Sequence, residues 1–331
     1  MSVPTTGSIR LAMMGLPRID SLDDLSATTH LSKGLIYRLC RFSDHFYKTC
    51  EIPKKSGGSR EIAQPSKEMK ALQGWILRNI LDPLCVSPAA KGFEKGTSVR
   101  DNAFPHRGCS AILCLDLEDF FPSIKVNQVW SVFRTVGYSP RMSAALASIC
   151  CYNRCLPQGA PTSPKLANLV TLRLDLRMLG FVGRRGIAYT RYADDLTFSS
   201  LSARKLQACF SVIQKIVESE GFRINGKKTR CAGPGRRHRI TGLVVTGDGV
   251  GIGRTSYRLL RARIFNLCKK RSGTVSSEDL ARVEGWVAFV NGVDKPRHRM
   301  ITTYIARLKY TREGTAISDL RVANQRTLMD S

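Results

Sequence analysis

The sequence is poor in acidic residues and has no long hydrophobic run. Its 331 residues include 26 Asp and Glu against 52 Lys and Arg, which gives a net charge of +26 at pH 7. Such an excess of positive charge indicates a polyanionic partner and favours nucleic acid over a membrane surface. No apolar run reaches the length that crosses a bilayer, and the run from Leu11 to Leu16 is too short for a secretory signal. We therefore expect a cytoplasmic protein with no membrane partner.

Two further absences concern cysteine and glycine patterns. The 11 cysteines contain no CxxC pair and no zinc-ligand spacing, which favours reduced thiols over a disulfide framework or a structural zinc. The glycines from Gly247 to Gly253 lack the surrounding strand–turn–helix unit and downstream acid of a dinucleotide-binding fingerprint. Hydrophobic residues still make up 43% of the chain, which is enough for two or three subdomains.

The most informative stretch that the chain does contain is a pair of adjacent carboxylates, Asp194 and Asp195. Runs rich in β-branched and aromatic residues flank the pair on both sides. Because Asp is a poor strand former, the pattern predicts a hairpin with the pair at its turn. Two adjacent anions repel each other unless a cation joins them, and hard oxygen ligands suit Mg²⁺. A solvated hairpin tip is the alternative.

A third carboxylate, Asp116, ends an apolar run of strand length that begins at Ala111. An aspartate there is costly to bury unless it is paired or binds a metal. Further along, residues 156–161 form a loop stiffened by Pro and Gly that opens a helix at Ser163, and such a loop holds polar groups at a fixed place. Three carboxylates on neighbouring strands can hold two Mg²⁺ ions for an in-line displacement at phosphorus.

The remaining chain predicts two hairpins and a basic helical region. Residues 47–65 are expected to form a basic hairpin with a flexible tip, and residues 240–252 a final hairpin. From residue 254 onward the sequence predicts mostly helix, in which Arg254, Arg258 and Arg261 recur at helical spacing. That stripe suits a phosphate backbone, and a solvated helix face is the alternative.

Four motifs and two further features, taken in chain order, resemble reverse transcriptases and among them the bacterial retron type. The motifs are Leu115–Pro122, Leu156–Pro164, Tyr192–Asp195 and, after Gly221, Asn225–Thr229. The retron features are the Asn-Ala-x-x-His stretch Asn102–His106, and Thr241–Leu243, preceded by Ile240 where Val is usual. The resemblance covers roughly residues 10–310, and the ordered set is far more specific than any one motif.

The resemblance implies an α+β protein with the right-hand polymerase fold, in which helices cover an antiparallel palm sheet and the thumb is helical. Mapped onto this chain, it implies four regions. They are an N-terminal helical extension at 1–48, fingers at 49–110, a palm with some interleaved fingers elements at 111–253, and a basic helical thumb with a C-terminal tail at 254–331.

The resemblance also implies a metal site. Asp116 and Asp194 would hold two Mg²⁺ ions, with Asp195 as the adjacent third carboxylate and the backbone carbonyl of Leu117 as a further ligand. One ion would lower the pKa of the attacking 3′-hydroxyl, and the other would neutralise the triphosphate leaving group.

Four residues would bind the nucleotide. Arg60 and Lys228 match positions at the triphosphate, and Gln158 one that supports the incoming nucleotide or the template. Phe121 would lie under the sugar, where its ring excludes a 2′-hydroxyl. A structural role in the fingers is the alternative for Arg60, and core packing is the alternative for Phe121. The retron residues Asn102 and His106 are interpreted as structural or RNA-contacting, not chemical.

The function implied is that of an RNA-directed DNA polymerase that uses deoxynucleoside triphosphates to copy its own structured non-coding RNA. The product would be a branched RNA–DNA molecule (msDNA), primed from a guanosine 2′-hydroxyl, within an antiviral defence system that includes an effector protein. A group II intron-like enzyme is one alternative, although a chain ending at residue 331 has no room for its usual maturation region. A catalytically idle RNA-binding palm protein is the other, and the intact aspartates argue against it.

Overall fold

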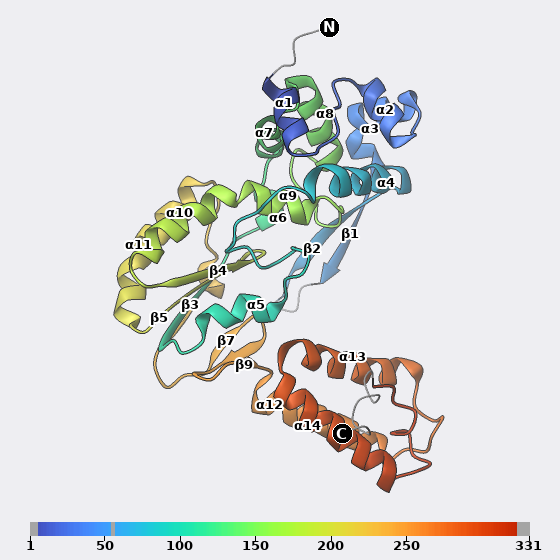
Figure 1. Cartoon of the computed structure of the whole chain (residues 1–331), viewed down its shortest axis with the longest axis vertical. Coiled ribbons are helices and arrows are strands. Elements are labelled where there is room, and N and C mark those ends of the chain that lie inside the picture. Colours follow the sequence, from blue (N-terminus) through green and yellow to red (C-terminus); the bar gives the residue numbers. More distant parts are fainter. Residues whose placement is uncertain (1–5, 54–56, 323–331) are drawn as a thin grey trace. The chain divides into compact units, whose positions relative to one another are not determined.

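The computed structural model describes residues 6–53 and 57–322 (Figure 1). Part of the predicted hairpin tip and the end of the predicted C-terminal tail lie outside these residues. The chain divides into two compact units, which are described separately. The first contains Met1–Thr97, Leu113–Phe198 and Arg204–Arg230, and the second contains Ser98–Ile112, Ser199–Ala203 and Cys231–Ser331. These units do not test the expected fingers, palm and thumb boundaries, which stay a prediction.

The first unit begins with short helices and the predicted basic hairpin. The helices are α1 (Thr6–Met13), α2 (Leu22–Thr29) and α3 (Lys33–Arg41). Ser21 and Ser32 cap α2 and α3, because each side chain accepts a hydrogen bond from the backbone N–H three residues later. The antiparallel pairing of β1 (Tyr47–Pro53) with β2 (Ser59–Pro65) confirms the hairpin.

The other helices of this unit include two with a serine cap at the start and one with a glycine at the end. They are α4 (Lys67–Ile76, continued by a π-helical turn at Leu77–Leu81), α6 (Phe120–Ser123), α7 (Val126–Val136), α8 (Pro140–Cys150), α9 (Ser163–Val170), α10 (Leu172–Gly183) and α11 (Ala203–Ser219). Ser66 and Ser139 cap α4 and α8. Gly137 ends α7 with a φ of 129°, which a residue with a side chain rarely adopts.

A four-stranded sheet brings the predicted carboxylates to one edge. Its strands lie in the order β4 (Ala188–Tyr192), β5 (Asp195–Ser200), β3 (Ala111–Asp116) and β6 (Arg230–Ala232). Most side chains of β3 and β5 are buried, and α10 packs on β4. Since β5 and β3 are neighbours, the end of β3 lies beside the β4–β5 turn, where the Leu117 N–H donates to the Asp194 carbonyl at 3.0 Å.

The second unit combines a small sheet with three long helices. Its elements are α5 (Val99–Ala103), β7 (His238–Ile240), β8 (Leu243–Val245), β9 (Val250–Gly251), α12 (Gly253–Leu267), α13 (Ser277–Val293) and α14 (Lys295–Thr311). The prediction of one hairpin over residues 240–252 was wrong in one respect. Ile240 belongs to a separate strand, because Thr241 and Gly242 both have positive φ and reverse the chain before β8.

The parts of the chain that the structure describes contain no membrane-spanning helix and no disulfide. No helix in residues 6–53 or 57–322 is both long and apolar enough to cross a bilayer. All eleven cysteines lie in these ranges, and each is a free thiol. The helices α12, α13 and α14 confirm the helical region that the sequence predicts after residue 253.

Candidate active site

The residues predicted from the sequence converge on one cleft of the first unit. The cleft has a volume of about 1190 Å³. Its lining includes seven of the eight predicted site residues: Arg60, Asp116, Leu117, Phe121, Gln158, Asp194 and Lys228. Asp195 begins β5, directly after the turn, and does not belong to the described lining.

Asp116 closes β3 and already has a cationic partner. Both of its carboxylate oxygens accept hydrogen bonds from the Lys228 Nζ, at 2.8 and 3.0 Å. Lys228 lies in a short turn whose first residues are tied to the strand, because the Asn225 N–H donates to the Asp116 carbonyl at 2.8 Å. The hydrogen bond to Asp116 raises the pKa of Lys228, so the ammonium group stays charged at neutral pH.

The turn that carries Asp194 is held in an unusual backbone conformation. Ala193 has a φ of 57°, in the left-handed region. Burial raises the pKa of Asp194, and the Asp116 carboxylate adds to that shift. Burial, with the Asp194 and Asp116 carboxylates, raises the pKa of Asp195 to about 6. Negative charge is therefore crowded at this turn, and a bound cation would relieve the repulsion.

The donor groups of the cleft fit a hard cation bound with its substrate. Within residues 6–53 and 57–322, no three His, Cys, Asp or Glu side chains gather as a ready-made metal cluster. The cleft instead offers the carboxylates of Asp116 and Asp194, the backbone of Leu117 and open space. Mg²⁺ is usually held by one or two carboxylates with waters and substrate phosphates, so this incomplete set suits it.

A backbone contact brings Arg60 and Gln158 to the same wall. Arg60 belongs to β2, and Gln158 to the loop before α9. The Ala63 N–H of β2 donates to the Gln158 carbonyl at 2.9 Å. Gly159 permits this contact, since a β-carbon there would lie 2.9 Å from the Ala63 carbonyl oxygen and its φ is 125°. This contact holds β2 and the loop together where Arg60 and Gln158 line the cleft.

Phe121 lies between the core and the cleft. It is half-buried, whereas its neighbour Phe120 is fully buried. The two ring centroids are 5.5 Å apart, and the Phe121 ring is 5.9 Å from that of Phe93, which also lines the cleft. Sequence reasoning missed Phe93, because nothing in its local pattern distinguishes it from an ordinary loop residue.

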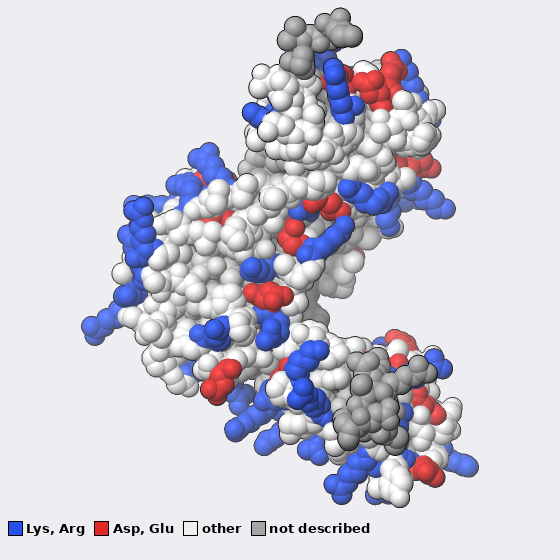
Figure 2. Space-filling view, viewed as in Figure 1, with Lys and Arg blue, Asp and Glu red and all other residues white. Residues whose placement is uncertain are grey.

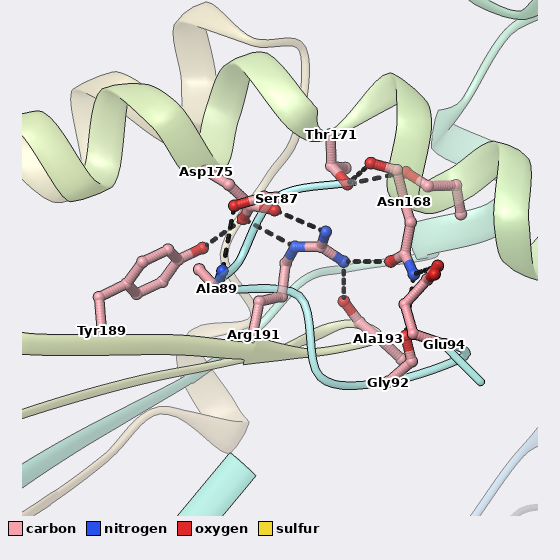
Figure 3. Close-up of polar contacts among 11 residues, drawn as sticks. Ser87, Ala89, Gly92, Glu94, Asn168, Thr171, Asp175, Tyr189, Arg191 and Ala193 are labelled. Atoms are coloured by element: carbon pink, nitrogen blue, oxygen red, sulfur yellow. Dashed lines mark hydrogen bonds and ion pairs between the residues drawn. The ribbon is translucent and has the colours of Figure 1, made fainter. Parts of the chain in front are cut away.

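Sequence reasoning also missed a buried charge network beneath the turn (Figure 3). Arg191 of β4 and Asp175 of α10 are both fully buried and form two hydrogen bonds, at 2.7 and 2.9 Å. The Tyr189 hydroxyl donates to the same carboxylate at 2.8 Å. The guanidinium also donates to the Asn168 side chain at 3.0 Å and to the Ala193 carbonyl at 3.1 Å. The network therefore supports the backbone immediately before Asp194.

The two retron-feature residues Asn102 and His106 lie in the second unit and are fully buried. The His106 Nδ1 and the Ser199 Oγ are 2.7 Å apart. Burial lowers the pKa of His106 to about 4, so the ring is neutral at physiological pH. These observations fit the structural interpretation of the pair.

Basic side chains outnumber acidic ones two to one in the sequence. Figure 2 shows Lys and Arg far more widely distributed than Asp and Glu on the face in view. In the second unit, Arg254, Arg258 and Arg261 are exposed on α12. The Arg261 guanidinium lies 4.3 Å from the centroid of the Tyr304 ring, a cation–π contact. Such a surface suits a phosphate backbone.

Comparisons with known proteins agree with the geometry. The family model "Reverse transcriptase (RNA-dependent DNA polymerase)" matches residues 52–245. The chain is 46% identical over 305 residues to the retron Ec86 reverse transcriptase of Escherichia coli, covering 91% of this chain and 93% of that protein. It is 35% identical to the retron Mx162 reverse transcriptase of Myxococcus xanthus, covering 90% and 69%.

Among solved structures, telomerase from Candida albicans in complex with a fragment of telomeric RNA is similar at a TM-score of 0.46 and 15% identity. The match covers 78% of this chain and 56% of that one, a similarity too weak to carry weight. The family model, by contrast, matches more than half of the chain, and the sequence identity extends over nearly all of it. The chain therefore belongs to the reverse transcriptase family, among the bacterial retron enzymes, as an RNA-directed DNA polymerase with that family's right-hand α+β fold.

Proposed function

We propose that this polymerase copies a structured non-coding RNA into a branched RNA–DNA product (msDNA), within a retron that serves antiviral defence. The RNA acts as template and as primer, through a guanosine 2′-hydroxyl. The observation that carries the proposal is the similarity to retron reverse transcriptases over 91% of the chain. A retron effector protein is a further proposed partner, and the cytoplasm is the proposed location.

The proposed roles follow from where each residue lies in the cleft. Asp116, Asp194 and the Leu117 carbonyl would hold two Mg²⁺ ions, and Asp195 would add negative charge beside them. When bound, the ions would lower the pKa of the attacking hydroxyl and neutralise the triphosphate leaving group. Arg60 and Lys228 bind the triphosphate, since both are cations in the cleft wall. Gln158 supports the nucleotide or template from its anchored loop.

The two alternatives have less support. Both relatives described above are retron enzymes, and no observation favours a group II intron-like enzyme. A catalytically idle protein has no need to keep two carboxylates in a cleft against their repulsion. Asp116 and Asp194 are retained there, and burial raises the pKa of Asp194.

Nucleic acid that copurifies with the protein tests the proposal. We expect the wild-type protein to carry one structured RNA, joined covalently to DNA complementary to part of that RNA. Digestion with ribonuclease should leave the DNA attached to a single branched nucleotide. The Asp194→Asn variant should carry the same RNA without DNA, because it binds template but does not extend it. An enriched intron RNA, or a mixture of unrelated RNAs, would contradict the retron assignment.

Replacing Phe121 tests the proposed exclusion of ribonucleotides. We expect Phe121→Ala to lower discrimination between a deoxynucleotide and its ribonucleotide by about 10- to 100-fold, since a pocket wall rejects one added hydroxyl by roughly that factor. The measurement is kcat/KM for single-nucleotide incorporation of each substrate. Phe133→Ala, in the core of α7, is the control that lowers stability alone. An unchanged ratio with a lowered Tm would assign Phe121 to the core.

A further inference from the structure

Phe93 has two properties that are unfavourable in a folded protein. Its φ is 66°, in the left-handed region that strains any residue with a β-carbon. The residue is also 43% exposed, although its side chain is large and apolar. Strained backbone persists only where the surroundings impose it, and it concentrates at ligand-binding and catalytic sites. Phe93 lines the cleft that holds Asp116 and Asp194.

The residues on either side of Phe93 are fixed by one side chain of α9. The Asn168 Nδ2 donates to the Gly92 carbonyl at 2.9 Å and to the Glu94 carboxylate at 3.0 Å. The other Glu94 oxygen accepts from the Lys165 Nζ at 2.8 Å. Gly92 packs closely against the β4–β5 turn that carries Asp194, since a β-carbon at Gly92 would lie 2.7 Å from the Ala193 nitrogen. The loop therefore packs directly against the turn.

The same loop is attached to β4 through Arg191. The Arg191 N–H donates to the Ala89 carbonyl at 2.8 Å, and the Lys91 N–H donates to the Arg191 carbonyl at 2.7 Å. The Arg191 guanidinium contacts both Asn168, which holds the loop, and the Ala193 carbonyl of the turn (Figure 3). Residues 89–94 and the turn that carries Asp194 thus form one connected piece.

The fixed loop places the Phe93 ring against Phe121. The ring centroids are 5.9 Å apart with an interplanar angle of 50°, while the buried Phe120 ring packs on Phe121 at 5.5 Å. Phe121 therefore has ring contacts with both Phe120 and Phe93. Without the Phe93 contact, the Phe121 ring would have more rotamer freedom, and the wall that it forms in the cleft would be less precisely positioned.

We infer that Phe93 is a positioning residue for sugar selection: it backs the Phe121 ring and so fixes the space left at C2′ of the incoming nucleotide. This inference rests on the proposed role of Phe121. The strained backbone is what aims the Phe93 ring at Phe121, and the contacts of Arg191 and Asn168 keep it there.

The test compares Phe93→Ala, Phe121→Ala and the double variant, by kcat/KM for single deoxynucleotide and ribonucleotide incorporation. We expect Phe93→Ala to lower discrimination about tenfold, the size of one aromatic packing contact. The double variant should discriminate no worse than Phe121→Ala alone, because Phe93 acts through that ring. Phe93→Tyr should retain wild-type discrimination. Phe289→Ala removes an equally exposed ring in the second unit and should change nothing.

A second variant separates positioning from folding. Glycine adopts a φ of 66° without strain, so Phe93→Gly should keep or raise the Tm while discrimination still falls. If Phe121→Ala relaxes discrimination and neither Phe93→Ala nor Phe93→Gly does, the inference is overturned while the role of Phe121 stands. Effects that multiply in the double variant would also overturn it. Unchanged discrimination in every variant would remove the proposed role of Phe121, and this inference with it.

Discussion

Asp194→Asn is expected to lower DNA synthesis by about a thousandfold or more while RNA binding stays nearly unchanged. The substitution keeps the shape of the side chain and removes the charge that binds a cation. It should not unfold the protein, since burial already raises the pKa of Asp194 and a neutral amide is easier to bury. Primer extension measures the synthesis, and a gel-shift assay measures RNA binding.

The matched control for that prediction is Asp23→Asn. Asp23 is an exposed carboxylate of α2 that pairs with Lys33, far along the chain from the turn. Both activities should be retained by this variant. Robust synthesis by Asp194→Asn would remove Asp194 from the metal site, and equal losses of synthesis and RNA binding would indicate a folding defect.

Asp175→Asn is expected to lower the free energy of unfolding by about 3–5 kcal/mol, the cost of leaving one member of a buried ion pair without its partner. Burial alone would lower the pKa of Arg191, but the Asp175 carboxylate more than offsets it and the net shift is upward. A guanidinium keeps its proton in proteins, so the substitution leaves a buried positive charge without its carboxylate partner. Urea denaturation monitored by circular dichroism measures the change.

Two variants make the second prediction specific. Asp20→Asn breaks an exposed Asp–Arg pair, whose side chains are 56% and 63% exposed, and should cost less than about 1 kcal/mol. The double variant Asp175→Leu with Arg191→Met removes both charges and should recover much of the lost stability. Its kcat should stay low, because the Ala193 carbonyl and Asn168 lose their common donor. Full activity in the double variant would show that the network only stabilises the fold.

Much of the site was predictable because its chemistry leaves local marks in the sequence. An aspartate at the end of an apolar strand and two aspartates inside a strand-forming run are each costly without a function. Asp116 and Asp194 do lie together in the cleft. The starts of α4 and α8 were equally predictable from the sequence. Ser66 and Ser139 cap these helices, and each accepts a hydrogen bond from a backbone N–H within one turn.

The parts that were missed depend on contacts between distant segments. Arg191 and Asp175 are 16 residues apart and on different elements, so only the packing of α10 on β4 reveals the pair. Alternation along β4 places Tyr189 and Arg191 on one face, which was the one available sign of a shared partner. The position of Phe93 depends on the close approach of Gly92 to Ala193, and these two residues are 101 positions apart in the sequence.

The ion pair between Lys228 and Asp116 has a consequence for how the enzyme cycles. The Lys228 ammonium group is the counter-ion of the Asp116 carboxylate. Under the proposed roles, both groups would change partners when a nucleotide binds: Asp116 would become a metal ligand, and Lys228 would bind the triphosphate. A lysine engaged with Asp116 is not available to the triphosphate, so nucleotide binding would compete with the ion pair.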